Sequence, residues 1–119
     1  AELGKVAGPA LSTLLQMLQD QRRPQNRVWS LRAIGHLGKA AAPAMSKLAA
    51  AIQDHLQPGG DVRVSVAALE AIQHLAESKP ELVDPLLPQL RRVAADPNDE
   101  VATSAQRAID AVENEDDGD

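Results

Sequence analysis

The chain has 119 residues, 44% of them hydrophobic, and a formal net charge of −5. It contains one tryptophan and no cysteine, phenylalanine or tyrosine, which excludes disulfides, thiolate metal sites and a cysteine nucleophile. No apolar run reaches the roughly 18 residues that a membrane span needs, and no segment has the order of a signal peptide. These features predict one soluble domain with an aliphatic core and no membrane partner, and they slightly favour the cytoplasm.

Apolar residues recur at helical spacing along the whole chain, and Pro, Gly and Asn clusters separate the runs. In the first run, Leu11, Leu14 and Leu18 fall on one face of a helix. The sequence predicts an all-α protein with six antiparallel helices, at about 8–20, 26–38, 43–55, 61–77, 81–95 and 98–113. Pro88 falls inside the fifth helix and should kink it or delay its start.

Two helical units alternate along the chain. Residues 3–20 read LGKVAGPALSTLLQMLQD and residues 37–54 read LGKAAAPAMSKLAAAIQD, with Leu, Gly, Lys, Ala, Pro, Ala, Ser, Leu, Gln and Asp in the same places. The other unit reads LRAIGHLG at 31–38 and LEAIQHLA at 69–76. Such a recurrence is typical of stacked helix pairs.

Residues 26–38, NRVWSLRAIGHLG, resemble the first helix of the HEAT-like repeats named after phycobilisome lyases. The family pattern is V-R-x-x-A-A-x-A-L-G-x-I-G, and the direct matches are Arg27, Ala33, Gly35 and Gly38. Gln73 and Ala76 depart from it in the next copy, where glycines are expected. The resemblance covers about residues 3–112. It implies an α-solenoid of about three HEAT-like helix pairs with a right-handed superhelix, whose second helices line the concave side.

By this resemblance the chain is a non-catalytic interaction module or scaffold that binds a protein or peptide. The alternative is a chromophore attachment factor of the phycobilin-lyase type or a HEAT-like protein that recognises DNA lesions. Both alternatives need aromatic or carboxylate groups that converge on a pocket, and the sequence shows neither. No nucleophile triad, phosphate-binding loop or HExxH motif occurs. We therefore expect no enzyme activity and no cofactor.

The repeat alignment identifies columns on the second helices that lie off the apolar stripe. The predicted protein-binding residues are Thr13, Gln16, Lys47, Gln89 and Arg92, together with Trp29. The row on the second helices is mostly small and polar with two cations, which suits an extended or helical segment with acidic groups; plain solvated surface is the alternative. Trp29 is either an exposed interface anchor or a plug buried between repeats.

Two sets of polar residues recur with the repeat. His36 and His74 occupy the same repeat position, but no third ligand recurs beside them, so we expect no metal site. Carboxylates at Asp20, Asp54 and Asp96 end helices, and Arg27 and Arg63 begin the helices that follow. We expect a ladder of Asp-to-Arg or Asp-to-backbone bonds that links the repeats. His55 is expected to sit at a helix end, where a cation suits the helix dipole.

The two ends of the array differ from its middle. Residues 1–112 form the predicted repeat domain, and residues 113–119, ENEDDGD, are expected to be a disordered acidic tail. The array lacks polar caps, so its first and last helices should expose apolar stripes and allow weak self-association.

Nucleic acid is not expected as a partner, because the charge balance is acidic and only Trp29 could stack on a base.

Overall fold

The computed structural model describes residues 12–19, 23–58 and 60–117, and of 38–40 and 114–117 it describes only the backbone. All regular structure in these ranges is helical, which confirms the all-α prediction there. The main helices are residues 12–18, α2 (Pro24–Gly35), α3 (Met45–Ile52), α4 (Val62–Ser78), α6 (Leu87–Val93) and α7 (Asp99–Asp117). The short ones are η1 (Gly38–Ala44), η2 (Asp54–Leu56), α5 (Pro80–Val83) and η3 (Asp84–Leu86). None of the described helices is both long and apolar enough to cross a bilayer.

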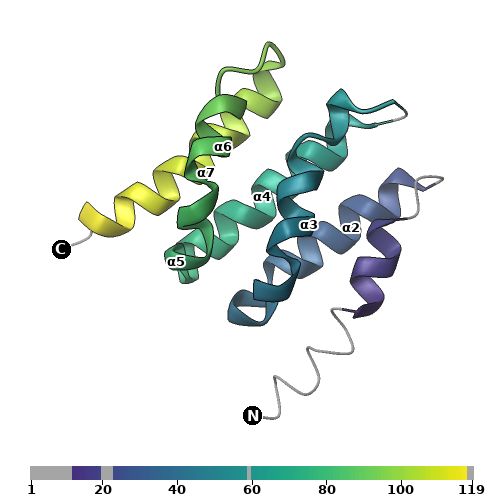
Figure 1. Cartoon of the computed structure of the whole chain (residues 1–119), viewed down its shortest axis with the longest axis horizontal. Coiled ribbons are helices and arrows are strands. Elements are labelled where there is room, and N and C mark those ends of the chain that lie inside the picture. The colour runs from purple at the N-terminus through teal and green to yellow at the C-terminus, as the bar shows by residue number, and fades with distance from the viewer. Residues whose placement is uncertain (1–11, 20–22, 59, 118–119) are drawn as a thin grey trace.

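The helices lie in two layers (Figure 1). The α2–α4–α7 layer has α4 in the middle, packed against α2 on one side and α7 on the other. The second layer consists of helix 12–18, α3 and α6, which cross over the first layer, and we call it the α3–α6 layer. The principal extents of 41 × 35 × 17 Å describe a flat molecule, and the shortest extent fits two helices packed about 10 Å apart.

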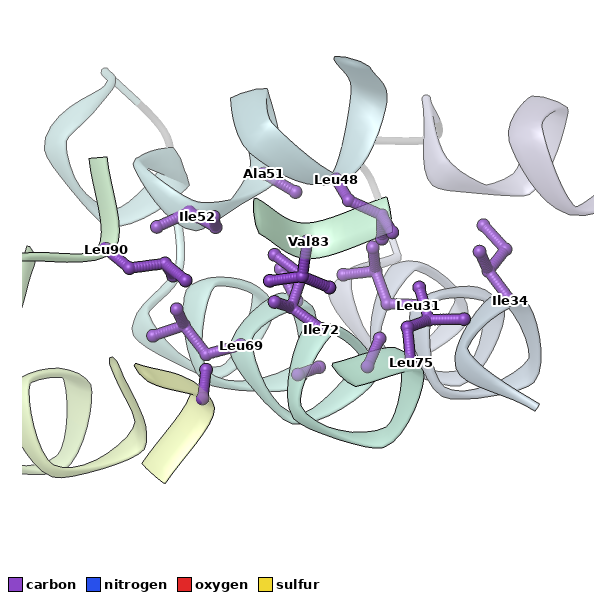
Figure 2. Close-up of a cluster of buried hydrophobic side chains, with 14 of the residues drawn as sticks. Leu31, Ile34, Leu48, Ala51, Ile52, Leu69, Ile72, Leu75, Val83 and Leu90 are labelled. Atoms are coloured by element: carbon purple, nitrogen blue, oxygen red, sulfur yellow. The ribbon is translucent and has the colours of Figure 1, made fainter. Parts of the chain in front are cut away.

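The core lies between the layers and consists almost entirely of aliphatic side chains. Leu48 and Ile52 point from α3 toward the other layer, where they meet side chains such as Ile72 of α4 (Figure 2). All three are fully buried. Within the α2–α4–α7 layer the contacts involve small residues, and the buried alanines of α4 and α7 are Ala67, Ala68, Ala71, Ala76, Ala105 and Ala108. Small side chains let neighbouring helices approach closely, which explains why this core needs no aromatic residue.

Prolines set where two of the second-layer helices begin. Pro43 lies inside the 3-10 helix η1, so the α-helix expected from residue 43 starts only at Met45. The helix expected over 81–95 is split into α5, η3 and α6, with Pro85 and Pro88 in the first two positions of η3 and α6. A proline is tolerated in a first turn because its missing N–H has no helical partner there. The delayed start predicted for Pro88 is thereby confirmed.

The end of the chain differs from the expectation. α7 continues to Asp117, into the segment 113–119 that was expected to be unstructured, and residues 118–119 lie outside the described residues. The last buried apolar residue is Val112, so the extension rests on helix propagation, which needs little free energy once a helix is formed. That this acidic segment is dispensable for stability stays a prediction.

The outer side of α7 is polar. Its apolar residues Val101, Ala105 and Ile109 are buried against α4 and α6, whereas its exposed residues include Thr103, Gln106, Arg107 and Asp110. The apolar stripe predicted for the last helix is therefore wrong, because packing uses the whole apolar face of α7. This end gives no apolar basis for self-association. Residues 1–11 at the other end lie outside the described part of the chain.

Gly35 sits where α2 crosses α4. A Cβ atom at this position would lie 2.8 Å from the Cα and 3.0 Å from the Cβ of Ala71. Ala normally stabilises a helix by about 1 kcal/mol relative to Gly, but here it would push the two helices apart, and overpacking costs roughly 1–3 kcal/mol. We expect Gly35→Ala to lower the free energy of unfolding in a urea titration. An unchanged or higher free energy of unfolding would mean that α2 and α4 do not cross this closely. The control is the opposite exchange, Ala42→Gly, at an exposed position.

Candidate functional site

A buried ion pair ties four helical segments together at the edge of the α3–α6 layer. Arg27 of α2 donates from Nη2 to Asp54 Oδ1 (2.6 Å) and from Nη1 to Asp54 Oδ2 (3.2 Å). Its Nε donates to the carbonyl of Leu18 (2.8 Å), and the N–H of Asp61 donates to Asp54 Oδ2 (2.9 Å). The pair is 9% and 10% exposed at the side chains. This confirms the predicted Asp-to-Arg and Asp-to-backbone bonds at Asp54; Asp20 lies outside the described residues.

The next link in the ladder uses a histidine that the sequence analysis assigned only to a helix end. His55 Nε2 lies 2.8 Å from Asp96 Oδ2, and its Nδ1 lies 2.9 Å from Ser65 Oγ. The His55 backbone N–H also donates to Ser65 Oγ (3.0 Å). Arg63 binds Asp61 on the surface (2.8 Å) and so contributes no Asp-to-Arg bond between repeats in the described part of the chain. At Asp96 the side-chain partner from the preceding repeat is His55.

The carboxylate of Asp96 connects this link to α7. The backbone N–H of Asn98 donates to Asp96 Oδ1 (2.8 Å), and Asn98 Oδ1 accepts from Val101 at the start of α7 (3.1 Å). The hydrogen bond from Asn98, followed by the one with His55, holds the pKa of Asp96 below its ordinary value of 3.8. Because both bonds favour the ionised carboxylate, its pKa must rise when they are lost on unfolding.

This lowered pKa gives a prediction for acid unfolding. A carboxyl with a depressed folded-state pKa stabilises the native state above its unfolded pKa, and that contribution disappears as pH falls below 3.8 toward the folded value. Urea titrations at about pH 5 and about pH 3 should therefore show a smaller loss of stability for Asp96→Asn than for the unchanged chain. Equal losses would show that Asp96 is not held ionised by these bonds.

His36 and His74 meet on the outside of the α2–α4–α7 layer. Their ring centroids are 4.5 Å apart with an angle of 73° between the planes, which is an edge-to-face contact. Arg32 and Glu70 line a small pocket of about 180 Å³ beside them. Within the described part of the chain, no group of three or more His, Asp or Glu side chains could hold a metal ion. The repeat position thus brings the two imidazoles together in a packing contact.

The main helices of the α3–α6 layer carry positive charge only. These three helices, residues 12–18, α3 and α6, carry the cations Lys47, Arg91 and Arg92 and no carboxylate. By contrast, α7 carries seven acidic residues and one arginine. We call the exposed side of the α3–α6 layer, with these three cations, the cationic face. Arg91 is paired with Glu113 (3.3 Å), whereas Lys47 and Arg92 form no ion pair with any described residue.

The predicted binding residues of the second helices all belong to this layer. Thr13, Gln16, Lys47 and Arg92 are exposed, as expected for columns off the apolar stripe. Gln89 is half-buried, because its side-chain amide donates to the Ala49 carbonyl (2.8 Å) and ties α6 to α3. Gln89 therefore fixes the spacing of two helices and has one fewer group to offer a partner.

A pocket opens on this face between helix 12–18 and α3. Its volume is about 400 Å³. The apolar part of its wall includes Leu15, Leu18, Ala50 and Ala51, and Lys47 stands among the lining residues. The Arg27–Asp54 pair also lines it and is satisfied by the bonds described above. The pocket thus combines an apolar wall with one unpaired cation.

Trp29 lies on the opposite layer from the other predicted residues. It is 59% exposed, which decides between the two alternatives in favour of surface exposure. It lines a pocket of about 370 Å³ with residues of α2, α4 and α7, including Val66, Arg63 and Glu100. This second surface carries charges of both signs, and its Arg32 is near Glu70 (3.7 Å). The structure therefore does not bring Trp29 together with Lys47 and Arg92.

No family model matches the sequence, and neither the curated proteins nor the solved structures contain a significant match.

Proposed function

We propose that the chain is a non-catalytic protein-interaction module built from HEAT-like helix pairs, and that it binds its partner on the cationic face. Along the chain, helices of the α3–α6 layer, the second helices of the repeat, alternate with helices of the α2–α4–α7 layer, the first helices. The repeated sequence units and this regular alternation support the solenoid assignment, and its right-handed course is what the resemblance to HEAT-like repeats implies. In that fold, the α3–α6 layer is the concave side.

The observation that carries the proposal is the alignment of exposed polar residues on equivalent helices beside a partly apolar pocket. Gln16, Lys47 and Arg92 come from three successive second helices and are all exposed. Stacked helices lie about 10 Å apart, so an extended partner meets all three. The pocket between helix 12–18 and α3 offers a place for an apolar side chain, and apolar anchors in pockets supply most of the affinity of many interfaces.

Site-specific photo-crosslinking tests this assignment. A photoreactive residue at exposed Ser46 of α3 should capture a partner in the source cells, and mass spectrometry should identify the same protein in repeated experiments. The matched control is the same residue at Thr103, which is exposed on α7. Capture from Thr103 and not from Ser46 would place the binding surface on the other layer and end the proposal.

A further inference from the structure

The cationic face has a charge that the molecule as a whole does not have. The chain carries a net charge of −5, yet helices 12–18, α3 and α6 contain only cations among their charged residues. Lys47 and Arg92 lack ion-pair partners among the described residues and stand exposed on neighbouring helices. An unpaired exposed cation keeps its full ability to attract an opposite charge, so this face selects its partner by charge.

We propose that the partner is an acidic peptide segment with one apolar side chain, bound in extended form across α3. This inference rests on the proposed function and adds the chemistry of the partner. The apolar side chain enters the pocket between helix 12–18 and α3, against Leu15 and Ala50. One carboxylate pairs with Lys47 at the pocket wall, and a second pairs with Arg92 beyond α3.

The spacing of the two cations sets the spacing of the acidic residues. Lys47 and Arg92 lie on the neighbouring helices α3 and α6, and packed helices are separated by roughly 10 Å. In an extended polyproline-II segment, residues three apart point to the same side and are separated by about 9 Å. The Gln89–Ala49 hydrogen bond keeps α3 and α6 at a fixed spacing. The face therefore favours carboxylates at positions n and n+3 of the bound segment.

An acidic peptide fits this face and nucleic acid does not. A phosphate backbone needs many cations for affinity, and this face has three, one of them paired with Glu113. Aromatic side chains on which bases stack are also needed for single strands, and the one tryptophan lies on the other layer. The apolar wall of the pocket, in contrast, suits a protein side chain.

Fluorescence anisotropy with a defined peptide tests the inference. The probe is a fluorescein-labelled peptide of about twelve residues, roughly 40 Å when extended, with Glu at every third position and one central Leu. Its length matches the 41 Å long dimension of the protein. We expect saturable binding that weakens as salt is added, since exposed ion pairs are screened. Replacing all Glu with Gln should abolish binding, and replacing the Leu with Ser should weaken it.

Two matched variants locate the site. Lys47→Glu with Arg92→Glu should weaken the probe about tenfold or more, because two attractions become repulsions. Arg32→Glu with Arg107→Glu changes the net charge by the same amount on exposed positions of the other layer and should leave the affinity unchanged. Equal effects of the two pairs, binding of the Gln peptide as tight as the Glu peptide, or no binding of the Glu peptide would each overturn the inference.

The outcomes separate this inference from the proposed function. If the Glu peptide fails to bind while Ser46 still captures a protein, the surface is right and the acidic chemistry is wrong. If Thr103 captures a protein and Ser46 captures nothing, the proposed binding surface is wrong, whatever the chemistry of the partner. A labelled DNA duplex is measured beside the peptide, and tighter binding of the duplex, lost in the Lys47→Glu, Arg92→Glu variant, would replace the acidic peptide with nucleic acid.

Discussion

Replacing Arg27 with methionine is expected to lower the free energy of unfolding by about 3–5 kcal/mol, the usual result of removing one partner of a buried ion pair. The substitution leaves Asp54 charged, 10% exposed and without its guanidinium, and it also leaves the Leu18 carbonyl without a donor. The Arg27–Asp54 pair joins helix 12–18, α2, η2 and the start of α4, so the loss should affect the whole array. Urea unfolding followed by circular dichroism measures it.

Two controls make this prediction specific. Arg63→Met removes the exposed pair with Asp61, whose arginine side chain is 69% exposed, and should change stability by less than about 1 kcal/mol. Arg27→Met combined with Asp54→Leu removes both charges and should be less destabilising than Arg27→Met alone. A loss below about 1 kcal/mol for Arg27→Met would show that the pair is not buried as described.

Replacing Leu48 with alanine is expected to lower the free energy of unfolding by about 2–5 kcal/mol. Leu48 is fully buried and points from α3 into the core between the two layers (Figure 2). The truncation leaves a cavity because α4 is held on both sides by α2 and α7 and cannot move to fill it. Chemical denaturation measures the loss, and the exposed Ser46→Ala serves as control with a change within about 0.5 kcal/mol. Similar small changes for both variants would contradict the two-layer packing.

The helices and their pairing were predictable because they depend on local and repeated signals. The apolar period around Leu31 and Ile34 predicts a buried helix face, and both residues are fully buried in the structure. The delayed start of α6 was predictable from Pro88 alone, since the proline ring removes a hydrogen-bond donor and restricts the backbone wherever it occurs. The end of α7 was not predictable in this way. No breaker follows Val112, so charge alone suggested disorder in a segment that continues the helix to Asp117.

The candidate site was predictable in part, for a related reason. Repeat columns placed Lys47 and Arg92 on one exposed layer, because equivalent positions of stacked helices share a face. The His55–Asp96 link was not predictable from repeat columns, since this link is a tertiary contact across 41 positions of the sequence. Whether Trp29 is exposed or buried was also undecided from the sequence, because this depends on how α2 is rotated relative to α4. The half-burial of Gln89 likewise follows from a contact between two helices.

Amide chemical-shift mapping tests whether the cationic face is the binding surface. The ¹⁵N-labelled chain is titrated with the partner segment identified from the Ser46 crosslink, and shifted amides are assigned to residues. We expect shifts concentrated in residues 12–19, 45–53 and 87–93, with little change around Trp29 and on the outer side of α7. Shifts concentrated around Trp29, Val66 and Glu100, with residues 45–53 unchanged, would contradict it.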